Sequence, residues 1–254
     1  TDTRKIQAGN LFFALKGPNF NANVLAKDAL EKGAIAAVID DAAYETDDKT
    51  LLVEDGLQAL QDLARDYRNT LKIPVIGLTG SNGKTTTKEL LFSVLSQKFH
   101  CYATAGNLNN HIGVPLSILQ IKPNHDVAVI EMGANKQGDI KELVEITLPT
   151  HSLITNIGKA HLEGFGGIEG IRKGKGELFD FLASNKGKAI INSDLDYLLP
   201  MSKSIEHVLY YGNTLGEINT SIIKSEPLLL MEVENKAWGK LNIQTQLVGS
   251  YNKP

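Results

Sequence analysis

A glycine-rich turn between an apolar strand and a helix constrains the fold of this chain more than any other stretch. Residues 77–89 read Gly-Leu-Thr-Gly-Ser-Asn-Gly-Lys-Thr-Thr-Thr-Lys-Glu and follow a short run of buried-strand type, residues 73–76. A turn of this kind exposes backbone N–H groups beside the positive end of a helix, where phosphate groups bind. Lys84 adds a charge for the outer phosphates, and Thr85 adds a hydroxyl for Mg²⁺. The stretch therefore predicts a nucleoside triphosphate site.

One position departs from the usual phosphate-loop pattern. That pattern has glycine five residues before Gly83, where this chain has Leu78. The alternative is a Gly/Ser/Asn turn followed by an ordinary helix start, because these residues favour turns and threonine is a good helix N-cap. The strand before the turn and the helix after it favour the phosphate site.

The composition indicates a folded protein of about two domains. The chain has 254 residues, 42% of them hydrophobic, which is enough for a substantial core. Its net charge of -3 gives no basic footprint, and we expect no nucleic-acid partner. The single cysteine, Cys101, excludes an intramolecular disulfide and multi-cysteine zinc sites. The longest clean apolar run, residues 34–39, is too short for a transmembrane segment, so we expect a cytoplasmic protein.

The first 72 residues read as a small α/β domain. A strand is expected over 11–15, and a helix over 24–32 with Asn23 as its N-cap. A second helix begins after Asp55, whose side chain is a good cap. We expect this domain to end at residue 72, where Lys-Ile-Pro marks a join.

The second domain is expected over residues 73–254. Apolar strands alternate with helices there, which predicts a P-loop-type, mainly parallel sheet covered on both faces. The last part, from about residue 218 to 248, reads as a strand-rich end. Ligands of such sheets bind at the carboxyl ends of the strands.

Two further strands deliver polar side chains to the edge of the sheet that carries the turn. Glu131 ends the apolar run 126–131, where it is placed to bind the Mg²⁺ that accompanies a nucleotide; its alternative role is a solvated acid at a strand end. His161 follows the strand over 153–157 and is a candidate for binding a second metal or polarising a phosphate. A loop histidine more often does neither.

A lysine lies inside the apolar stripe of the helix expected over 168–181. Lys175 falls between Ile171 and Leu178 at helical spacing. Desolvation there lowers the pKa of the amine and makes its neutral form available to add carbon dioxide, which would give a carbamate ligand for metal. The alternative is a lysine whose stem packs on the helix while its ammonium reaches solvent. The pattern leaves both open.

Three asparagines follow the second strand of the sheet. Asn107, Asn109 and Asn110 offer paired donors and acceptors for a sugar or amide ligand. The same residues are good turn formers, and a purely structural role is the alternative.

The chain resembles the Mur ligases over essentially its whole length. Their shorter Thr-Gly-x-x-Gly-Lys-Thr loop accounts for Leu78. Five motifs in the family's order carry the resemblance: Thr79-Gly-Ser-Asn-Gly-Lys-Thr-Thr-Thr-Lys-Glu, Gly106-Asn-Leu-Asn-Asn-His-Ile-Gly-Val-Pro, Ile130-Glu-Met-Gly-Ala-Asn, Asn156-Ile-Gly-Lys-Ala-His-Leu-Glu-Gly-Phe-Gly and Lys175-Gly-Glu-Leu-Phe.

The resemblance implies an ATP-dependent amide ligase of peptidoglycan precursor synthesis that works through an acyl phosphate. It is strongest to the branch that joins D-alanyl-D-alanine to UDP-MurNAc-tripeptide, so these two molecules, ATP and Mg²⁺ are the implied partners. Residues 1–72 would bind the UDP end of the substrate and residues 73–254 would bind ATP. We expect a monomer.

The resemblance also implies roles for individual residues. Those that would contact ATP are Gly80, Ser81, Asn82, Gly83, Lys84, Thr85, Thr86 and Asn252. Those that would hold metal are Thr85, Glu131, His161 and Lys175 as its carbamate. The catalytic residues would be Lys84, Lys175 and His161, and the substrate-binding residues Thr3, Arg4, Asn107 and Asn110.

A third, carboxyl-terminal domain that closes over ATP is also implied, and this chain stops before it. We therefore expect a fragment of a longer protein that is inactive by itself. The alternatives are a sister Mur ligase, a ligase similar to folylpolyglutamate synthetase, and a non-catalytic switch that binds ATP.

Overall fold

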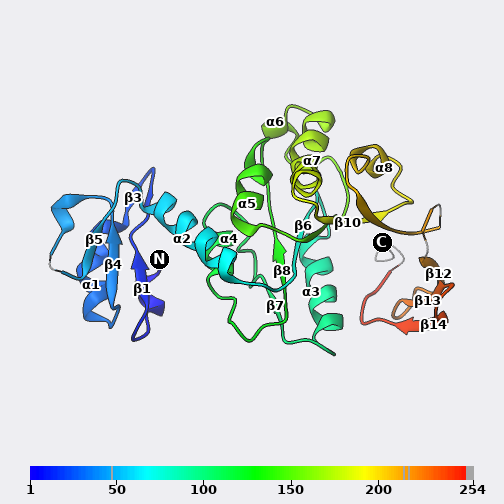
Figure 1. The fold of residues 1–254 in the computed structure, drawn as a ribbon, viewed down its shortest axis with the longest axis horizontal. Helices are drawn as coiled ribbons and strands as arrows, with labels where there is room; N and C mark the ends of the chain where they lie inside the picture. Colours follow the sequence, from blue (N-terminus) through cyan, green and yellow to red (C-terminus); the bar gives the residue numbers. More distant parts are fainter. Residues whose placement is uncertain (47, 214, 217, 250–254) are drawn as a thin grey trace. The chain divides into compact units, whose positions relative to one another are not determined.

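Two compact units make up the chain. They are Thr1–Thr70 and Leu71–Pro254, coloured from blue to red along the sequence in Figure 1. The computed structural model describes residues 1–46, 48–213, 215–216 and 218–249. In these ranges, no helix is both long and apolar enough to span a membrane. Each unit has its own sheet and its own apolar core.

The first unit is built on a three-stranded parallel sheet of order β1-β4-β5, with a small hairpin of β2 and β3. Phe12 and Ile39 from the sheet pack against Ala26 and Ala29 of the following helix in its core. The elements are η1 Thr3–Lys5, β1 Leu11–Phe13, β2 Lys16–Gly17, β3 Phe20–Asn21, η2 Ala22–Leu25, α1 Ala26–Glu31, β4 Ala36–Ile39, η3 Ala42–Tyr44, β5 Thr50–Leu52 and α2 Gly56–Thr70.

One of the two expected helix caps in this unit is confirmed and the other is wrong. Asp55 caps α2, because its Oδ1 accepts hydrogen bonds from the backbone N–H groups of Leu57 and Gln58 at 2.8 and 2.9 Å. Asn23 caps nothing: it is fully buried, and its side chain exchanges two hydrogen bonds with Asp40 at 2.7 and 3.0 Å. Residues before α1 form a 3-10 turn, and Asn21 caps that turn instead.

The second unit contains a nine-stranded sheet of order β14-β13-β12-β11-β10-β9-β6-β8-β7. The strands are parallel from β7 to β12, and β13 and β14 are antiparallel. The strands are β6 Val75–Thr79, β7 Cys101–Ala103, β8 Val127–Glu131, β9 His151–Ile154, β10 Lys188–Asn192, β11 His207–Tyr211, β12 Ile218–Lys224, β13 Leu230–Asn235 and β14 Gly239–Gln244. The helices are α3 Lys84–Leu95, α4 Gly113–Ile118, α5 Asp139–Thr147, α6 Leu162–Phe165, α7 Ile168–Ser184 and α8 Leu198–Met201.

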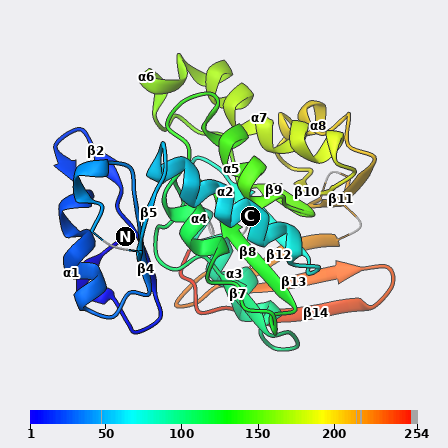
Figure 2. The ribbon, with the colours of Figure 1, turned by 60° about the vertical axis from the view of Figure 1, so that its left-hand side comes forward.

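Helices cover both faces of the parallel part of this sheet. The helix α3 packs on β6, β7 and β8, whereas α5 packs on β6 and α7, and α7 packs on β9 and β10. The helix α3 connects β6 to β7, whereas α5 and α7 connect strands in the opposite direction along the sheet, from β8 to β9 and from β9 to β10. Because crossovers between parallel strands are right-handed, α3 lies on one face of the sheet, and α5 and α7 lie on the other (Figures 1 and 2). The predicted fold class is confirmed, including the strand-rich end, which appears as the orange and red strands of Figure 2.

The register of the central strands fixes where the candidate side chains meet. Leu78 of β6 pairs with Glu131 of β8, and Thr79 pairs with Ile154 of β9. These three parallel strands therefore end at one edge of the sheet. The segments that follow them carry the turn over 80–83 and the residues after Ile154.

Candidate functional site

The turn between β6 and α3 depends on two glycines. Gly80 has a φ of +155°, and a Cβ there would collide with the side chain of Thr155. Gly83 has a φ of +76° and is the N-cap residue of α3, so no side chain caps the first N–H groups of this helix. The helix start is therefore left as a positive, hydrogen-bond-donating end that suits an anion.

The loop after β9 holds this turn from one side. The backbone N–H groups of Ser81 and Asn82 donate to the main-chain and side-chain oxygens of Asn156, at 2.9 and 3.1 Å. Thr155 Oγ1 donates to the carbonyl of Asn82 at 2.6 Å, and Gly158 N–H donates to Ser81 Oγ at 2.9 Å. The shape of the turn is thus fixed by the neighbouring strand as well as by its own glycines.

A cavity of about 340 Å³ lies between the turn and the end of β8. Lys84 lines it, with its Nζ donating to the carbonyls of Gly80 and Ser81 at 2.9 and 3.4 Å. Burial lowers the pKa of Lys84, and the charge of Glu131 partly opposes that shift. The full lining is Ser81, Asn82, Gly83, Lys84, Thr85, Thr86, Asn109 and Glu131.

The two carboxylate oxygens of Glu131 have different surroundings. Its Oε1 accepts hydrogen bonds from Asn109 Nδ2 at 2.8 Å and from Thr85 Oγ1 at 3.4 Å. Its Oε2 is buried and has no hydrogen-bond partner within the described ranges, and the same holds for Thr79 Oγ1. A buried carboxylate oxygen without a donor is costly unless a cation completes it, and Mg²⁺ prefers such oxygen ligands. The residues present therefore fit Mg²⁺.

Lys175 is buried in α7, which decides between the two alternatives that its pattern left open. The residue is 2% exposed, and its Nζ lies 5.6 Å from the centre of the Phe165 ring. No hydrogen bond or ion pair of its side chain occurs in the part of the chain that the structure describes. Burial, with a smaller effect of Lys84, lowers the pKa of this amine to about 8. The amine is thus held largely away from solvent, and its neutral form is accessible.

His161 is exposed and begins the short helix α6 in the left-handed region, with a φ of +56°. Its ring makes no hydrogen bond or ion pair with any residue in the described ranges, and no cluster of three or more His, Cys, Asp or Glu suited to a metal is found there. A role for His161 in binding a second metal stays a prediction.

The three asparagines have different positions. Asn110 Oδ1 accepts from the N–H groups of Ile112 and Gly113, at 3.1 and 2.8 Å, which is the turn-forming role. Asn107 is exposed, and its carbonyl accepts from Asn109 N–H. Asn109 is the one that lines the cavity, through its bond to the Glu131 carboxylate described above. The sequence did not single it out, since nothing in an Asn-Leu-Asn-Asn run tells which side chain turns towards β8.

The other predicted positions belong to the first unit or fall outside the described residues. Thr3 and Arg4 are in the first unit, in η1, where Asp2 caps the turn and its carboxylate binds the Arg4 guanidinium at 2.9 Å. The Arg4 side chain is 85% exposed. Asn252 lies outside the described residues.

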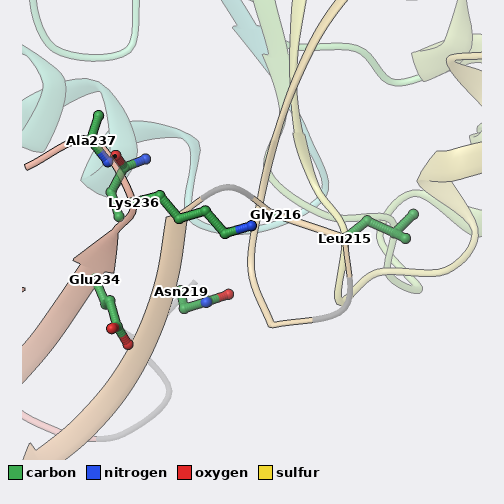
Figure 3. Close-up of a pocket in the computed structure, with 7 residues that line it drawn as sticks. Leu215, Gly216, Asn219, Glu234, Lys236 and Ala237 are labelled. Carbon is green, nitrogen blue, oxygen red and sulfur yellow. Dashed lines mark hydrogen bonds between the residues drawn. The ribbon is translucent and has the colours of Figure 1, made fainter. Parts of the chain in front are cut away.

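Two of the other depressions in the second unit differ in whether they adjoin the turn. One, of about 520 Å³, continues from the turn along α3 and is lined by Asn82, Gly83, Thr86, Thr87, Leu90, Leu91, Leu153, Thr155, Asn156, Ile190 and Tyr211. The other, of about 530 Å³, lies in the strand-rich end (Figure 3). There the Lys236 side chain reaches towards Gly216, and Glu234 and Asn219 lie near each other. It contains none of the predicted site residues.

Comparison with known proteins identifies similar chains. A sequence profile described as the Mur ligase middle domain matches residues 78–253. The chain is 45% identical over 194 residues to the UDP-N-acetylmuramoyl-tripeptide--D-alanyl-D-alanine ligase of Escherichia coli (strain K12). That match covers 76% of this chain and 42% of the relative.

Solved structures give the same result. A crystal structure of MurF from Acinetobacter baumannii superposes with a TM-score of 0.88 at 32% identity, covering 99% of this chain and 56% of that one. The MurF ligase of Thermotoga maritima, solved in complex with ADP, superposes with a TM-score of 0.84 at 31% identity, covering 96% and 56%. The chain thus spans about half the length of these relatives.

Proposed function

This chain belongs to the Mur ligase family, and on that premise we propose that the natural gene product carrying it joins D-alanyl-D-alanine to UDP-MurNAc-tripeptide, with conversion of ATP to ADP and phosphate. The observation that carries the proposal is the cavity in which Lys84, Thr85 and Glu131 meet at the uncapped start of α3. The second unit would bind ATP, and the first unit, with Thr3 and Arg4, would bind the UDP end of the substrate.

The turn supplies the phosphate site in this proposal. Residues 80–86 would contact ATP. The backbone N–H groups of Ser81 and Asn82 already donate to Asn156, so those at the uncapped start of α3 would bind the outer phosphates. Lys84 would exchange its bonds to the carbonyls of Gly80 and Ser81 for bonds to a phosphate, a change that costs little because both partners are nearby acceptors. Asn252, which follows the described residues, would face the nucleotide.

Thr85 and Glu131 would hold Mg²⁺, which when bound neutralises charge on the transferred phosphoryl group. The fit rests on Glu131 Oε2, which has no hydrogen-bond donor among the described residues, and on the nearby Thr85 hydroxyl. Asn109 keeps the carboxylate oriented by donating to its other oxygen.

The reaction proposed is a two-step acyl transfer. A carboxylate oxygen of the tripeptide attacks the γ-phosphorus, the bond to the bridging oxygen breaks, and ADP leaves. The amine of D-alanyl-D-alanine then attacks the acyl carbon, phosphate leaves, and the nitrogen loses a proton to give the amide. Lys84 favours the first step, because it offsets charge as two anions approach. Asn107 and Asn110 would line the muramoyl-peptide side.

Lys175 would act as a carbamate in this proposal, with His161 beside it as a ligand for a second metal. With its pKa near 8, roughly one Lys175 amine in ten is neutral at pH 7 and can add carbon dioxide, with loss of one proton. The product carries a negative charge, which Lys84 would attract, whereas Lys84 repels the ammonium form. The absence of a polar partner for the amine within the described ranges also supports an added oxygen-bearing group.

The proposal is tested by measuring phosphate release by that gene product with ATP, UDP-MurNAc-tripeptide and D-alanyl-D-alanine, and again with each component left out. Release only with all three is expected. Release with another acceptor would point to a sister Mur ligase or a folylpolyglutamate-synthetase-like ligase. ATP binding without release in any mixture would contradict the proposal and favour a switch.

A further inference from the structure

Lys88 is a buried lysine that the proposed chemistry does not use. Its side chain is 0% exposed, in the middle of the helix that begins at the phosphate-binding turn. It lies four residues after Lys84 and therefore on the same side of α3. Lysine is almost never fully buried unless its charge has partners, so its contacts identify what it does.

The contacts of Lys88 lead to the segment after β7. Its Nζ donates to the carbonyl oxygens of Thr104 and Gly106, at 2.7 and 3.2 Å. It also pairs with the carboxylate of Glu89 at 2.9 Å, and that carboxylate is 62% exposed. Lys88 thereby fastens the start of the loop over 104–110 to the helix that starts in the turn.

The same loop holds Glu131 at two points. Thr104 Oγ1 accepts a hydrogen bond from the backbone N–H of Glu131 at 3.0 Å. Asn109 Nδ2 donates to the Glu131 carboxylate at 2.8 Å, and the Asn109 carbonyl accepts from Gly133 N–H at 2.7 Å. Both the main chain and the side chain of Glu131 therefore depend on where this loop lies.

We propose that Lys88 is a positioning residue for Glu131, acting through the loop over 104–110. Without its ammonium, the buried Thr104 carbonyl loses a strong donor, and the loop can shift to regain one from solvent. Asn109 then no longer fixes the Glu131 carboxylate. The turn over 80–83 is held separately, by the loop after β9, and keeps its shape.

The inference rests on the proposed function, because it takes Glu131 as a Mg²⁺ ligand. It is tested by titrating ADP into the natural gene product and its Lys88→Met variant, with Mg²⁺ and with EDTA. ADP affinity in EDTA is expected to stay within twofold. The Mg²⁺ concentration that gives half of the Mg²⁺-dependent gain in affinity is expected to rise about 10-fold or more, the usual effect of losing an outer-shell partner. Lys98→Met, at an exposed lysine beyond the same helix, is the control.

A second variant, Asn109→Ala, tests the inference even if Lys88→Met does not fold. Asn109 is only partly buried, and its loss should give the same Mg²⁺ defect. The double variant should be little worse than either single one, because the two residues act in series. Normal Mg²⁺ dependence in Asn109→Ala, or additive defects, would overturn the inference. If the unaltered protein itself shows no Mg²⁺-dependent ADP binding, it is the proposed function that fails.

Discussion

The two sides of the candidate site are held by different forces. On the Glu131 side, hydrogen bonds from Asn109 and Thr85 fix the carboxylate directly. On the α7 side, Lys175 is buried against the Phe165 ring, without a hydrogen bond or ion pair in the described ranges. Hydrogen bonds set the geometry of the Glu131 carboxylate on the first side, whereas packing holds Lys175 on the second side, with a desolvated charge. The second side should therefore be the more sensitive to pH and to a bound anion.

The largest expected effect is a loss of ATP affinity on the Glu131 side, when Lys84 is replaced. Lys84→Met should weaken ATP binding on the order of 100-fold, because one preorganised donor to the phosphates is lost. Stability should not fall, since burial lowers the pKa of Lys84 and so already penalises its charged form. Titration with a fluorescent ATP analogue and thermal unfolding measure the two effects.

The control for Lys84 is Lys98→Met, which removes an exposed ammonium beyond the carboxyl end of α3. It should change neither quantity. An ATP affinity of Lys84→Met within threefold of that of the unaltered protein would show that Lys84 does not contribute to phosphate binding. The Glu131 side of the site would then not bind ATP in the way proposed.

Next in size is the pH dependence of stability at Lys175. Its folded-state pKa of about 8 is below the ordinary 10.5, so the unfolded chain holds a proton that the folded chain gives up between these values. The free energy of unfolding of the unaltered protein, relative to that of a Lys175→Met variant, therefore rises from about pH 8 to pH 10.5. Below pH 8 the variant should be more stable by about 3 kcal/mol, the free energy of the pKa difference. Urea unfolding at pH 7 and pH 10, in buffer free of bicarbonate, measures it.

Lys173→Met is the matched control on the same helix, because Lys173 is exposed. Its stability difference should be small and flat with pH. A Lys175→Met difference that stays constant from pH 7 to pH 10 would mean that the lysine titrates normally. Adding bicarbonate should stabilise the unaltered protein and leave Lys175→Met unchanged if a carbamate forms.

A smaller effect is expected where α7 approaches Phe165 most closely. A Cβ at Gly170 would collide with the Phe165 carbonyl oxygen, which is backbone and cannot move aside cheaply. Gly170→Ala should therefore destabilise the protein by about 1–3 kcal/mol, as overpacking does. Gly176, also in α7, would meet only the terminal methyl of Met201 at 3.4 Å, so Gly176→Ala should be neutral or slightly stabilising. Equal urea midpoints for the two variants would contradict close packing on this side.

Local patterns in the sequence predicted most of the fold and part of the site. The turn before Lys84 and the cap at Asp55 each follow from a local pattern, and the structure confirms both. The helical spacing placed Lys175 in an apolar stripe but left its burial open, and the structure shows that it is buried. The sequence did not predict features that depend on register between distant segments. Asn23 is buried because Asp40 lies opposite it, and Asn109 rather than Asn110 faces Glu131 because of how its loop meets β8.

The smallest expected effect concerns hydrogen bonds on the α7 side, between α7 and the start of α5. The two carboxylate oxygens of Glu177 accept from the N–H groups of Gly138 and Lys141, at 2.7 and 2.8 Å. The carboxylate thus caps the positive end of α5 from another helix, two residues after Lys175. Glu177→Gln keeps one acceptor and loses the charge, so it should cost about 1 kcal/mol.

Salt separates this capping role from packing alone. The loss in Glu177→Gln should shrink between 0.05 and 1 M salt, because screening weakens the attraction between the carboxylate and the helix end (a range of about 14 to 3 Å in Debye length). Glu169→Gln, which alters an exposed carboxylate of the same helix paired with Arg172, should have little effect at any salt concentration. A Glu177→Gln loss that does not change with salt would mean that shape, not charge, joins α7 to α5. On the α7 side, shape and packing would then account both for the burial of Lys175 and for the contact of α7 with α5. The Glu131 side, where hydrogen bonds fix the carboxylate, would differ from it more clearly.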